Sequence, residues 1–282
     1  MSCLRPITIR QKGELVTVPC GRCPNCFYNK IAGWTFRLLE EERHSISSQF
    51  ITLTYDTNHL VCTPYGKASL TKYDLQNFFK RLRKNKCNRG RNIKYYAVGE
   101  YGSQTKRPHY HAIIFNAHID SFQSAWTLDK QLIGDIHYGD VSHASIGYTL
   151  KYLNKKSTIG LIGDDDRHPQ FSLSSNGLGL SYLSQNILSY HMADLYNRNY
   201  LTLPGGQKCP MPRYYYEKIY DGYNRDLLKM SGSLIRQDEF YKNFVTGYFN
   251  SPQSLKDEQL RTIRIQAAFD RLYHENQKQL VL

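Results

Sequence analysis

The sequence predicts an α+β fold in which helices flank a central antiparallel β-sheet, preceded by a cysteine knuckle and followed by a mainly helical region. Runs rich in β-branched and aromatic residues alternate with amphipathic runs in the order helix, strand, helix, strand, strand, helix. Three cysteines with the spacing C-x2-C-x2-C precede most of these elements. With 282 residues, of which 40% are hydrophobic, the chain can bury a substantial core.

The first predicted elements are a turn-rich knuckle at residues 19–26 and a helix at residues 27–43. Residues 50–56 (FITLTYD) are typical of a strand, because β-branched and aromatic residues predominate. Residues 71–86 predict a second helix, with Thr71 at its N-terminus as a capping residue. The apolar stripes consist of Phe27, Ile31, Trp34 and Leu38 in the first helix, and Leu75, Phe78, Phe79 and Leu82 in the second.

Two neighbouring strands follow at residues 94–100 (KYYAVGE) and 109–116 (HYHAIIFN). The connection between them, YGSQTKRP, is rich in turn-forming residues, so an antiparallel hairpin is expected. Residues 143–156 (HASIGYTLKYLNKK) predict a further helix, because aliphatic side chains gather on one of its faces.

The signals weaken beyond residue 160. Residues 160–179 are typical of a loop, residues 182–200 of a helix and residues 203–212 of a linker, while residues 214–282 have largely helical periodicity. We therefore expect three parts, which are a cysteine knuckle with the first helix (1–45), a sheet-containing core (46–160) and a mainly helical C-terminal region (161–282).

The net charge of +13 is concentrated in the first part of the chain. Residues 1–159 contain 23 of the 37 Lys and Arg but only 11 of the 24 Asp and Glu. Such a positive field favours a polyanion, because bound phosphates release condensed counterions. We find no signal-peptide pattern and no membrane-spanning apolar run, so we expect a protein that stays in the cytoplasm. The candidate DNA-binding residues are Lys80, Arg81, Arg83, Lys84, Lys106, Arg107 and Lys155.

His109 and His111 form a His-x-His pattern on a predicted strand. Residues two apart on a strand point to the same face, so both imidazoles can reach one ion. Glu100 ends the preceding strand, and hairpin pairing brings its carboxylate alongside the two rings. Two histidines and one carboxylate leave open positions on a divalent ion, which suits Mg²⁺ or Mn²⁺ with phosphate oxygens as further ligands.

Tyr148 and Tyr152 lie about one turn apart on the predicted helix and share a face with Lys151 and Lys155. A phenol becomes a better nucleophile where positive charge lowers its pKa, and a lysine also stabilises charge that develops on a phosphate. The sequence therefore indicates two candidate nucleophiles, with Lys151 as their catalytic helper. Tyrosine pairs with the same spacing occur elsewhere in the chain, so the neighbouring lysines distinguish this pair.

Cys20, Cys23 and Cys26 could bind a structural Zn²⁺, with Cys3 as the first candidate for the fourth ligand. An iron–sulfur cluster is an alternative, although the four-cysteine spacing of ferredoxins is not completed nearby. Free thiols are the third possibility. Seven cysteines without a secretion signal do not favour a disulfide framework.

In their order and spacing these motifs resemble those of the HUH endonuclease superfamily. The strand FITLTYD is similar to the first motif, HYH at residues 109–111 to the second, and YTLKY at residues 148–152 to the third motif in its two-tyrosine form. The chain is more similar still to rolling-circle replication initiators of gokushovirus-like Microviridae, which also carry a cysteine knuckle. Two further stretches resemble these initiators, namely SSNGLGLSYL and PRYYYEKI.

The resemblance implies an HUH endonuclease core of RRM-like type, with a divalent ion on the two histidines. It implies nicking of single-stranded DNA at a viral origin, a covalent 5′-phosphotyrosine link and rejoining of strands in rolling-circle replication. The expected partners are an origin strand with a hairpin, a host helicase and a host DNA polymerase, in the host bacterial cytoplasm.

Two alternatives to a replication initiator remain open from the sequence. A relaxase or transposase of a mobile element would use the same chemistry for another task. A non-enzymatic, zinc-stapled DNA-binding protein would use His109 and His111 as structural residues. Metal-dependent nicking of an oligonucleotide separates the enzymes from the binding protein.

Overall fold

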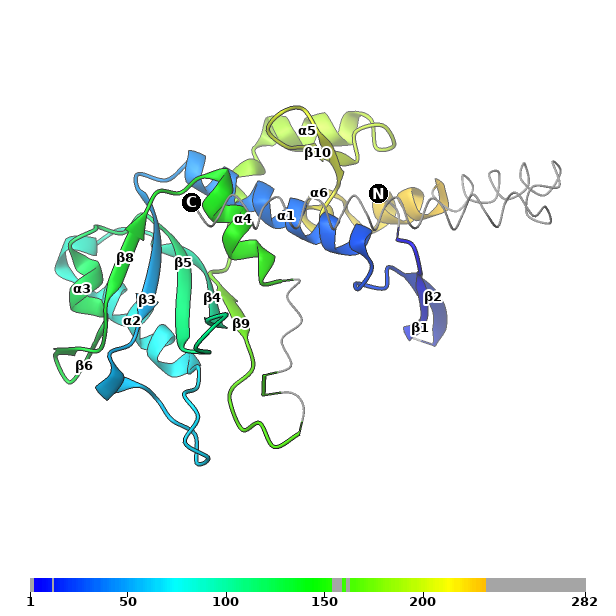
Figure 1. Cartoon of the computed structure of the whole chain (residues 1–282). Coiled ribbons are helices and arrows are strands. Elements are labelled where there is room, and N and C mark those ends of the chain that lie inside the picture. Colours follow the sequence, from blue (N-terminus) through cyan, green and yellow to red (C-terminus); the bar gives the residue numbers. More distant parts are fainter. Residues whose placement is uncertain (1–2, 12, 154–158, 161–162, 232–282) are drawn as a thin grey trace. The chain divides into compact units, whose positions relative to one another are not determined.

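The computed structural model describes residues 3–11, 13–153, 159–160 and 163–231. These residues form two compact units (Figure 1). Arg37–Ser181, here called the core unit, contains the histidine and tyrosine motifs. The knuckle unit combines the residues before Arg37 with those after Ser181 and contains the cysteine knuckle. The predicted helical segment beyond residue 231 lies outside the described residues.

The centre of the core unit is an antiparallel sheet of five strands, β3 (Ser48–Thr54), β4 (Lys94–Tyr101), β5 (Pro108–Phe115), β8 (Ile136–Gly139) and β9 (Phe171–Ser174). The strand order is β8-β3-β5-β4-β9, which can be followed in Figure 1. β4 and β5 form the predicted hairpin, and every residue of β3 pairs with β5. The predicted α+β fold with a central antiparallel sheet is confirmed, while the two edge strands β8 and β9 were not predicted.

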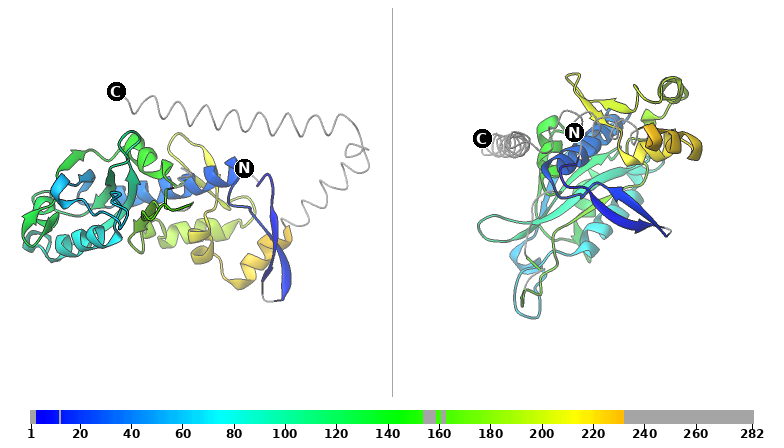
Figure 2. Two further views of the ribbon diagram at one scale, coloured as in Figure 1. Left: turned by 60° about the horizontal axis from the view of Figure 1, so that its bottom comes forward. Right: turned by 90° about the vertical axis from the view of Figure 1, so that its right-hand side faces the viewer.

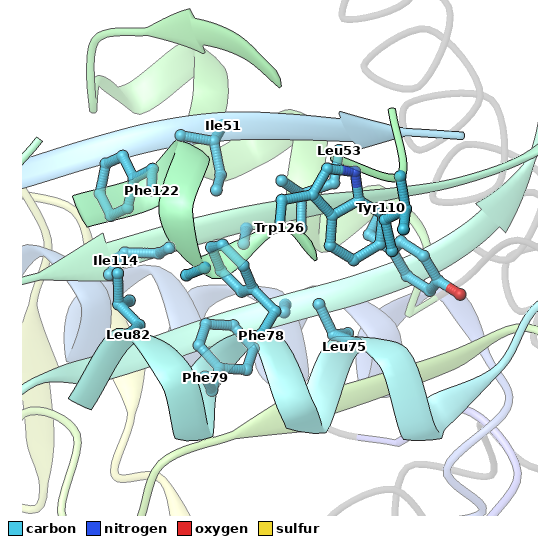
Figure 3. Packing of buried hydrophobic residues seen from close by; sticks show 14 of the residues in the cluster. Ile51, Leu53, Leu75, Phe78, Phe79, Leu82, Tyr110, Ile114, Phe122 and Trp126 are labelled. Carbon is cyan, nitrogen blue, oxygen red and sulfur yellow. The ribbon is translucent and has the colours of Figure 1, made fainter. Parts of the chain in front are cut away.

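Helix α2 (Lys72–Lys84) packs on one face of this sheet (Figure 3). Thr71 caps the helix, because its side-chain oxygen accepts a hydrogen bond from the backbone N–H of Tyr73. The predicted apolar stripe of α2 is completely buried, and removal of each such side chain from water contributes about 2 kcal/mol. This core consists of Leu75, Phe78, Phe79 and Leu82 from α2, Ile51 and Leu53 from β3, Tyr110, Ala112 and Ile114 from β5, and Phe122 and Trp126.

The opposite face of the sheet carries the alternate residues of the same strands, because successive side chains point to opposite faces. Helix α4 (His143–Lys151) lies over this face next to β5. The last turns of α1 (Pro24–Arg43) also reach it, since Lys94 on β4 forms an ion pair with Glu41 at 2.9 Å. Glu41 is buried and also accepts a hydrogen bond from the backbone N–H of Gly179, so its charge has two partners.

Short elements complete the connections of the described chain. The indole N–H of Trp126 donates to the carbonyl of Thr54 at 2.9 Å, which ties one connection to the end of β3. None of the described helices is long and apolar enough to span a lipid bilayer. The short elements are η1 (Thr57–His59), η2 (Lys86–Asn88), α3 (Ser121–Ala125), β6 (Thr127–Leu128), β7 (Gln131–Leu132) and η3 (Leu180–Tyr182).

The knuckle unit contains a separate two-stranded hairpin, β1 (Ile7–Gln11) and β2 (Glu14–Val18), dark blue in Figure 2. It also contains the first turns of α1 and the helices α5 (Gln185–Ala193) and α6 (Arg213–Ile219), of which α5 occupies the middle of the helix predicted at residues 182–200. Aromatic and aliphatic side chains form its core, with Ala32, Phe36, Leu201, Cys209, Tyr215, Ile219 and Tyr220 buried.

A second hairpin in the knuckle unit corrects the prediction of a linker at residues 203–212. β10 (Tyr200–Thr202) pairs with β11 (Lys208–Pro210) in this segment. Gly205 and Gly206 have φ angles of 85° and 82°, a conformation that glycine adopts without steric cost. The two glycines therefore turn the chain back on itself, where the sequence alone indicated only an irregular connection.

Candidate active site

Glu100, His109 and His111 converge on one point of the core unit. Glu100 on β4 pairs directly with His109 on β5, so their side chains lie on the same face of the sheet. The Nε2 atoms of His109 and His111 lie 2.8 Å and 3.0 Å from Oε1 of Glu100. The three ligand atoms all lie within 4.8 Å of one another, so this group could hold one metal ion.

The outer nitrogens of both imidazoles have partners that fix the orientation of the rings. Nδ1 of His109 donates to the backbone carbonyl of Arg107 at 3.1 Å, and Nδ1 of His111 lies 2.9 Å from Oγ1 of Thr52. Phe50 stacks on the ring of His111, with centroids 5.8 Å apart. Such second contacts orient imidazoles that bind metals, and they leave both Nε2 atoms directed at Glu100.

The tautomer of His109 provides a test of whether a cation fits this site. A carbonyl only accepts, so Nδ1 of His109 must carry a proton. In a neutral imidazole Nε2 then turns a lone pair toward the carboxylate oxygen of Glu100. That contact is favourable only when a proton or a metal ion lies between the two atoms, so the donor set fits a divalent cation.

The ionisation of the three groups matches what a metal ion requires. Burial opposes the charge of Glu100, but hydrogen bonds from His109, His111 and Tyr152 outweigh it and hold the pKa of this carboxyl well below its usual range. Burial also lowers the pKa of His111, against the opposing effect of Glu100. At neutral pH the site therefore contains an ionised carboxylate and a neutral His111.

Both tyrosine hydroxyls reach the same oxygen of Glu100. Tyr152 donates to Oε1 of Glu100 at 2.6 Å, and the hydroxyl of Tyr148 lies 3.5 Å from that atom and 3.2 Å from Nε2 of His111. A capping box of Ser142 and Ser145 begins helix α4, which buries its aliphatic side and directs these phenols to the site. Tyr148 lies within α4, whereas Tyr152 is its C-cap residue.

Lys151 lies over the rings of the two tyrosines, with Nζ 3.7 Å from the ring centroid of Tyr148 and 5.0 Å from that of Tyr152. Burial and the negative charge of Glu100 nevertheless raise the pKa of Tyr152, and burial is the main cause of the raised pKa of Tyr148. One lysine thus does not offset the nearby carboxylate. A cation bound to Glu100 would remove that opposition.

The other predicted DNA-binding residues are divided between places. Lys80, Arg81, Arg83 and Lys84 lie on α2, on the opposite face of the sheet from the candidate site. Lys106 and Arg107 lie in the connection from β4 to β5, and the structure brings Arg107 beside His109. Lys155 lies outside the described residues.

Four cysteines come together in the knuckle unit, with their sulfur atoms all within 4.8 Å of one another. The Sγ–Sγ distance is 3.9 Å from Cys3 to Cys23 and 4.0 Å from Cys20 to Cys26. A disulfide requires about 2 Å, so these atoms are not bonded to each other. The separations are close to those of four sulfurs around an ion with bonds of about 2.3 Å.

Backbone N–H groups surround these sulfur atoms. Cys20 N–H donates to Sγ of Cys3 at 3.2 Å, and the N–H groups of Arg22 and Cys23 both donate to Sγ of Cys20 at 3.4 Å. The hydrogen bond from Arg22 is the main reason why the pKa of Cys20 is lowered to about 6. The N–H donors favour a thiolate, which is the form that binds metals.

Comparison with known proteins places these sites in a family. The family of the replication-associated protein ORF2 matches residues 48–157. The Replication-associated protein VP4 of Bdellovibrio phage phiMH2K is 31% identical over 250 residues, which cover 76% of this chain and 76% of that protein. The chain belongs to this family of phage replication-associated proteins.

Two further members of the replication-associated family are similar to this chain. The ORF2 protein of Spiroplasma virus 4 is 27% identical over 287 residues, covering 87% of this chain and 84% of that protein. The ORF4 protein of Chlamydia phage 1 is 25% identical over 255 residues, covering 83% and 57%. The resemblance to microvirus replication proteins is thereby confirmed. No solved structure shows a significant match.

The segment that matches the replication-associated family, residues 48–157, contains the complete His–Glu–Tyr site. The segment begins with β3, which supplies Thr52 and Phe50 to the surroundings of His111. The sequence did not single out these two residues. Their signal was alternation, since Phe50 and Thr52 occupy the same face of the strand FITLTYD.

Proposed function

We propose that this replication-associated protein is a metal-dependent endonuclease and strand transferase that nicks single-stranded DNA at a phage origin and rejoins the strands. The observation that carries this proposal is the meeting of two phenols and two imidazoles at a single carboxylate oxygen, Oε1 of Glu100. A phosphate beside this atom would be within reach of either tyrosine. Structural packing alone gives no reason for four polar side chains to share one buried acceptor.

Glu100, His109 and His111 would hold the metal, for which Mg²⁺ or Mn²⁺ is the best candidate because three protein ligands leave positions for phosphate oxygens. When bound, the ion supplies Lewis-acid polarisation of the scissile phosphate. Thr52 and the carbonyl of Arg107 orient the two imidazoles, so the ligands are held before DNA arrives.

One tyrosine hydroxyl attacks the phosphorus, and its proton is lost as the new phosphotyrosine bond forms. The bond from phosphorus to the 3′ oxygen breaks, which releases a 3′-hydroxyl that serves as a primer. Lys151 is placed over both rings and would stabilise negative charge on the phenolate or the phosphate. The phosphotyrosine bond conserves the energy of the broken phosphodiester, so rejoining requires no ATP.

Two tyrosines at one site allow two successive cleavages. After one round of synthesis, the second tyrosine would cut the regenerated junction. The 3′-hydroxyl released by that cut would attack the first phosphotyrosine bond and close a circle. The distance of 5.6 Å between the ring centroids of Tyr148 and Tyr152 places both nucleophiles close enough to act on one bound phosphate in turn.

We also propose that the four cysteines hold a structural Zn²⁺. Four thiolates complete a tetrahedral shell, and N–H groups directed at sulfur stabilise the thiolate form. The ion would fix the N-terminal segment to the start of α1 and take no part in the chemistry. The partners in replication would be the single-stranded origin, with a hairpin, and a host helicase and DNA polymerase.

The deciding experiment is incubation of the protein with a single-stranded origin oligonucleotide and Mn²⁺, followed by a denaturing gel. We expect a covalent protein–DNA adduct that EDTA prevents, with mass spectrometry locating the DNA on Tyr148 or Tyr152. Binding without any adduct would instead identify a non-enzymatic DNA-binding protein. An adduct on another tyrosine would refute the site.

A further inference from the structure

An open groove of about 490 Å³ lies at the end of the sheet beside the candidate metal site. The end of β3, the β4–β5 connection and the residue before β8 form its walls. Its volume lies within the range of about 300–1,000 Å³ that is usual for small-ligand sites. His109 lines the groove and is also a candidate metal ligand, so a molecule in the groove would lie next to the scissile phosphate.

Two exposed carboxylates, Asp56 and Asp135, line this groove. Their backbones are fixed, because the N–H of Asp56 donates to the carbonyl of Ile133 at 2.9 Å and the carbonyl of Asp135 accepts from the N–H of Thr54 at 3.0 Å. Within the described ranges, neither carboxylate has a hydrogen-bond or ion-pair partner. The groove therefore presents two hydrogen-bond acceptors on a rigid frame.

Arg107 connects the groove to the metal site. Its guanidinium donates to the backbone carbonyl of Tyr55, which fixes the side chain against the wall of the groove. Its own carbonyl accepts the hydrogen bond from Nδ1 of His109. The same residue thus shapes the groove and orients a candidate ligand, so occupation of the two places is geometrically linked.

The chemistry of the walls decides which part of a DNA strand fits. A phosphate would meet repulsion from Asp56 and Asp135. A second metal ion is not favoured, because the only groups of three or more convergent ligands among the described residues are the four cysteines and the Glu100 cluster. The edge of an unpaired base, by contrast, offers N–H donors that two carboxylates can accept.

We propose that this groove binds an unpaired base next to the scissile phosphate, and that Asp56 and Asp135 select guanine. Guanine presents its N1–H and its amino group side by side, which suits acceptors of this kind. Adenine and cytosine each offer one amino group beside a ring acceptor. Thymine has a single N–H between two carbonyls, which the carboxylates repel. The inference rests on the proposed nicking function, since it names the DNA feature that this site recognises.

The test uses a single-stranded DNA library with a randomised centre, wild-type protein and Mn²⁺. Covalently captured fragments and released 3′-hydroxyl fragments are sequenced, which aligns every molecule on its cut. We expect guanine to be enriched at one position beside the cut. Asp56→Asn and Asp135→Asn should each reduce that enrichment between about fivefold and about a hundredfold, because an amide replaces one acceptor with a donor.

Asp129→Asn is the matched control. Asp129 is exposed, lies outside the groove and has a φ of 49°, a conformation that asparagine adopts easily. It should retain the wild-type preference, and the melting temperature of every variant is measured to verify folding. Unchanged guanine enrichment in both groove variants would overturn the inference while the nicking function stands.

A second selection separates this inference from the nicking function. The same library is selected for binding in EDTA, where no cleavage occurs. If wild-type protein forms no adduct with Mn²⁺, the nicking function fails. Guanine enrichment among the bound strands that is lost in Asp56→Asn and Asp135→Asn would still support the groove. Equal recovery of all four bases by wild-type protein would overturn it.

Discussion

The two ligand clusters of this protein are built in opposite ways. Three ligands of the core unit, Glu100, His109 and His111, come from paired strands and leave room beside them for two phenols. Four sulfurs of the knuckle unit come from one short segment and are enclosed by backbone N–H groups. An incomplete shell suits chemistry and a complete shell suits structure. The contrast assigns the reaction to one unit and the staple to the other.

The largest effect is expected from removing both phenols. The double variant Tyr148→Phe with Tyr152→Phe should form no covalent adduct but still bind DNA, because phenylalanine keeps the ring and lacks only the hydroxyl. Each single variant should retain some cleavage and lose release of closed circles. Adducts are measured on denaturing gels, with Tyr196→Phe, at an exposed position, as the control. Circle release by a single variant would show that one tyrosine suffices.

Loss of an imidazole should come next in size. His109→Ala and His111→Ala should each slow nicking at least about a hundredfold while the protein stays folded, because the cation loses a ligand. Glu100→Ala should be less severe, since water can replace one ligand. Nicking rates are compared with those of His118→Ala, whose ring contacts Asp120 outside the site. Wild-type rates in both imidazole variants would end the metal proposal.

An intermediate effect is expected from Thr52, which touches only the outer nitrogen of His111. Thr52→Val should weaken metal affinity by about 10- to 100-fold, because the imidazole loses the partner that orients it. Thr52→Ser retains the hydroxyl and should behave like the wild type. The measurement is the Mn²⁺ concentration required for half-maximal nicking. An equal loss in the serine variant would point to packing instead of orientation.

The smallest effect on nicking is expected in the knuckle unit. Cys20→Ser or Cys26→Ser should reduce bound zinc from about one ion per chain to almost none, because a tetrahedral site loses a ligand. Nicking by the core unit should stay close to the wild-type rate. Elemental analysis gives the zinc content, and Cys87→Ser, at an exposed cysteine outside the cluster, is the control. A parallel loss of nicking would show that the two units are not independent.

Features that depend on local sequence were predicted well. The alternation in HYHAIIFN and the short connection to KYYAVGE were enough to bring Glu100 opposite His109. The stripe of α2 and the capping residue Thr71 were also predicted, because helix periodicity and capping are local properties.

Features that depend on distant pairing were missed. Thr52 meets His111 because β3 pairs with β5, a contact across 59 positions of the chain. The edge strands β8 and β9 have four residues each, which is too short for a distinctive pattern. The hairpin β1–β2, which returns the chain so that Cys3 meets Cys20, has a signal in the alternating stretches ITIRQ and ELVTV on either side of Gly13.

Tyr148 and Tyr152 are chemically identical but differ in how firmly the chain holds them. Tyr148 lies within α4, so moving its backbone would break helical hydrogen bonds on both sides. Tyr152 is the C-cap, where helices begin to fray and a change of backbone angle breaks few bonds. We expect one stationary and one travelling nucleophile, so that a DNA end attached to Tyr152 can be carried aside while Tyr148 stays in place to make the second cut.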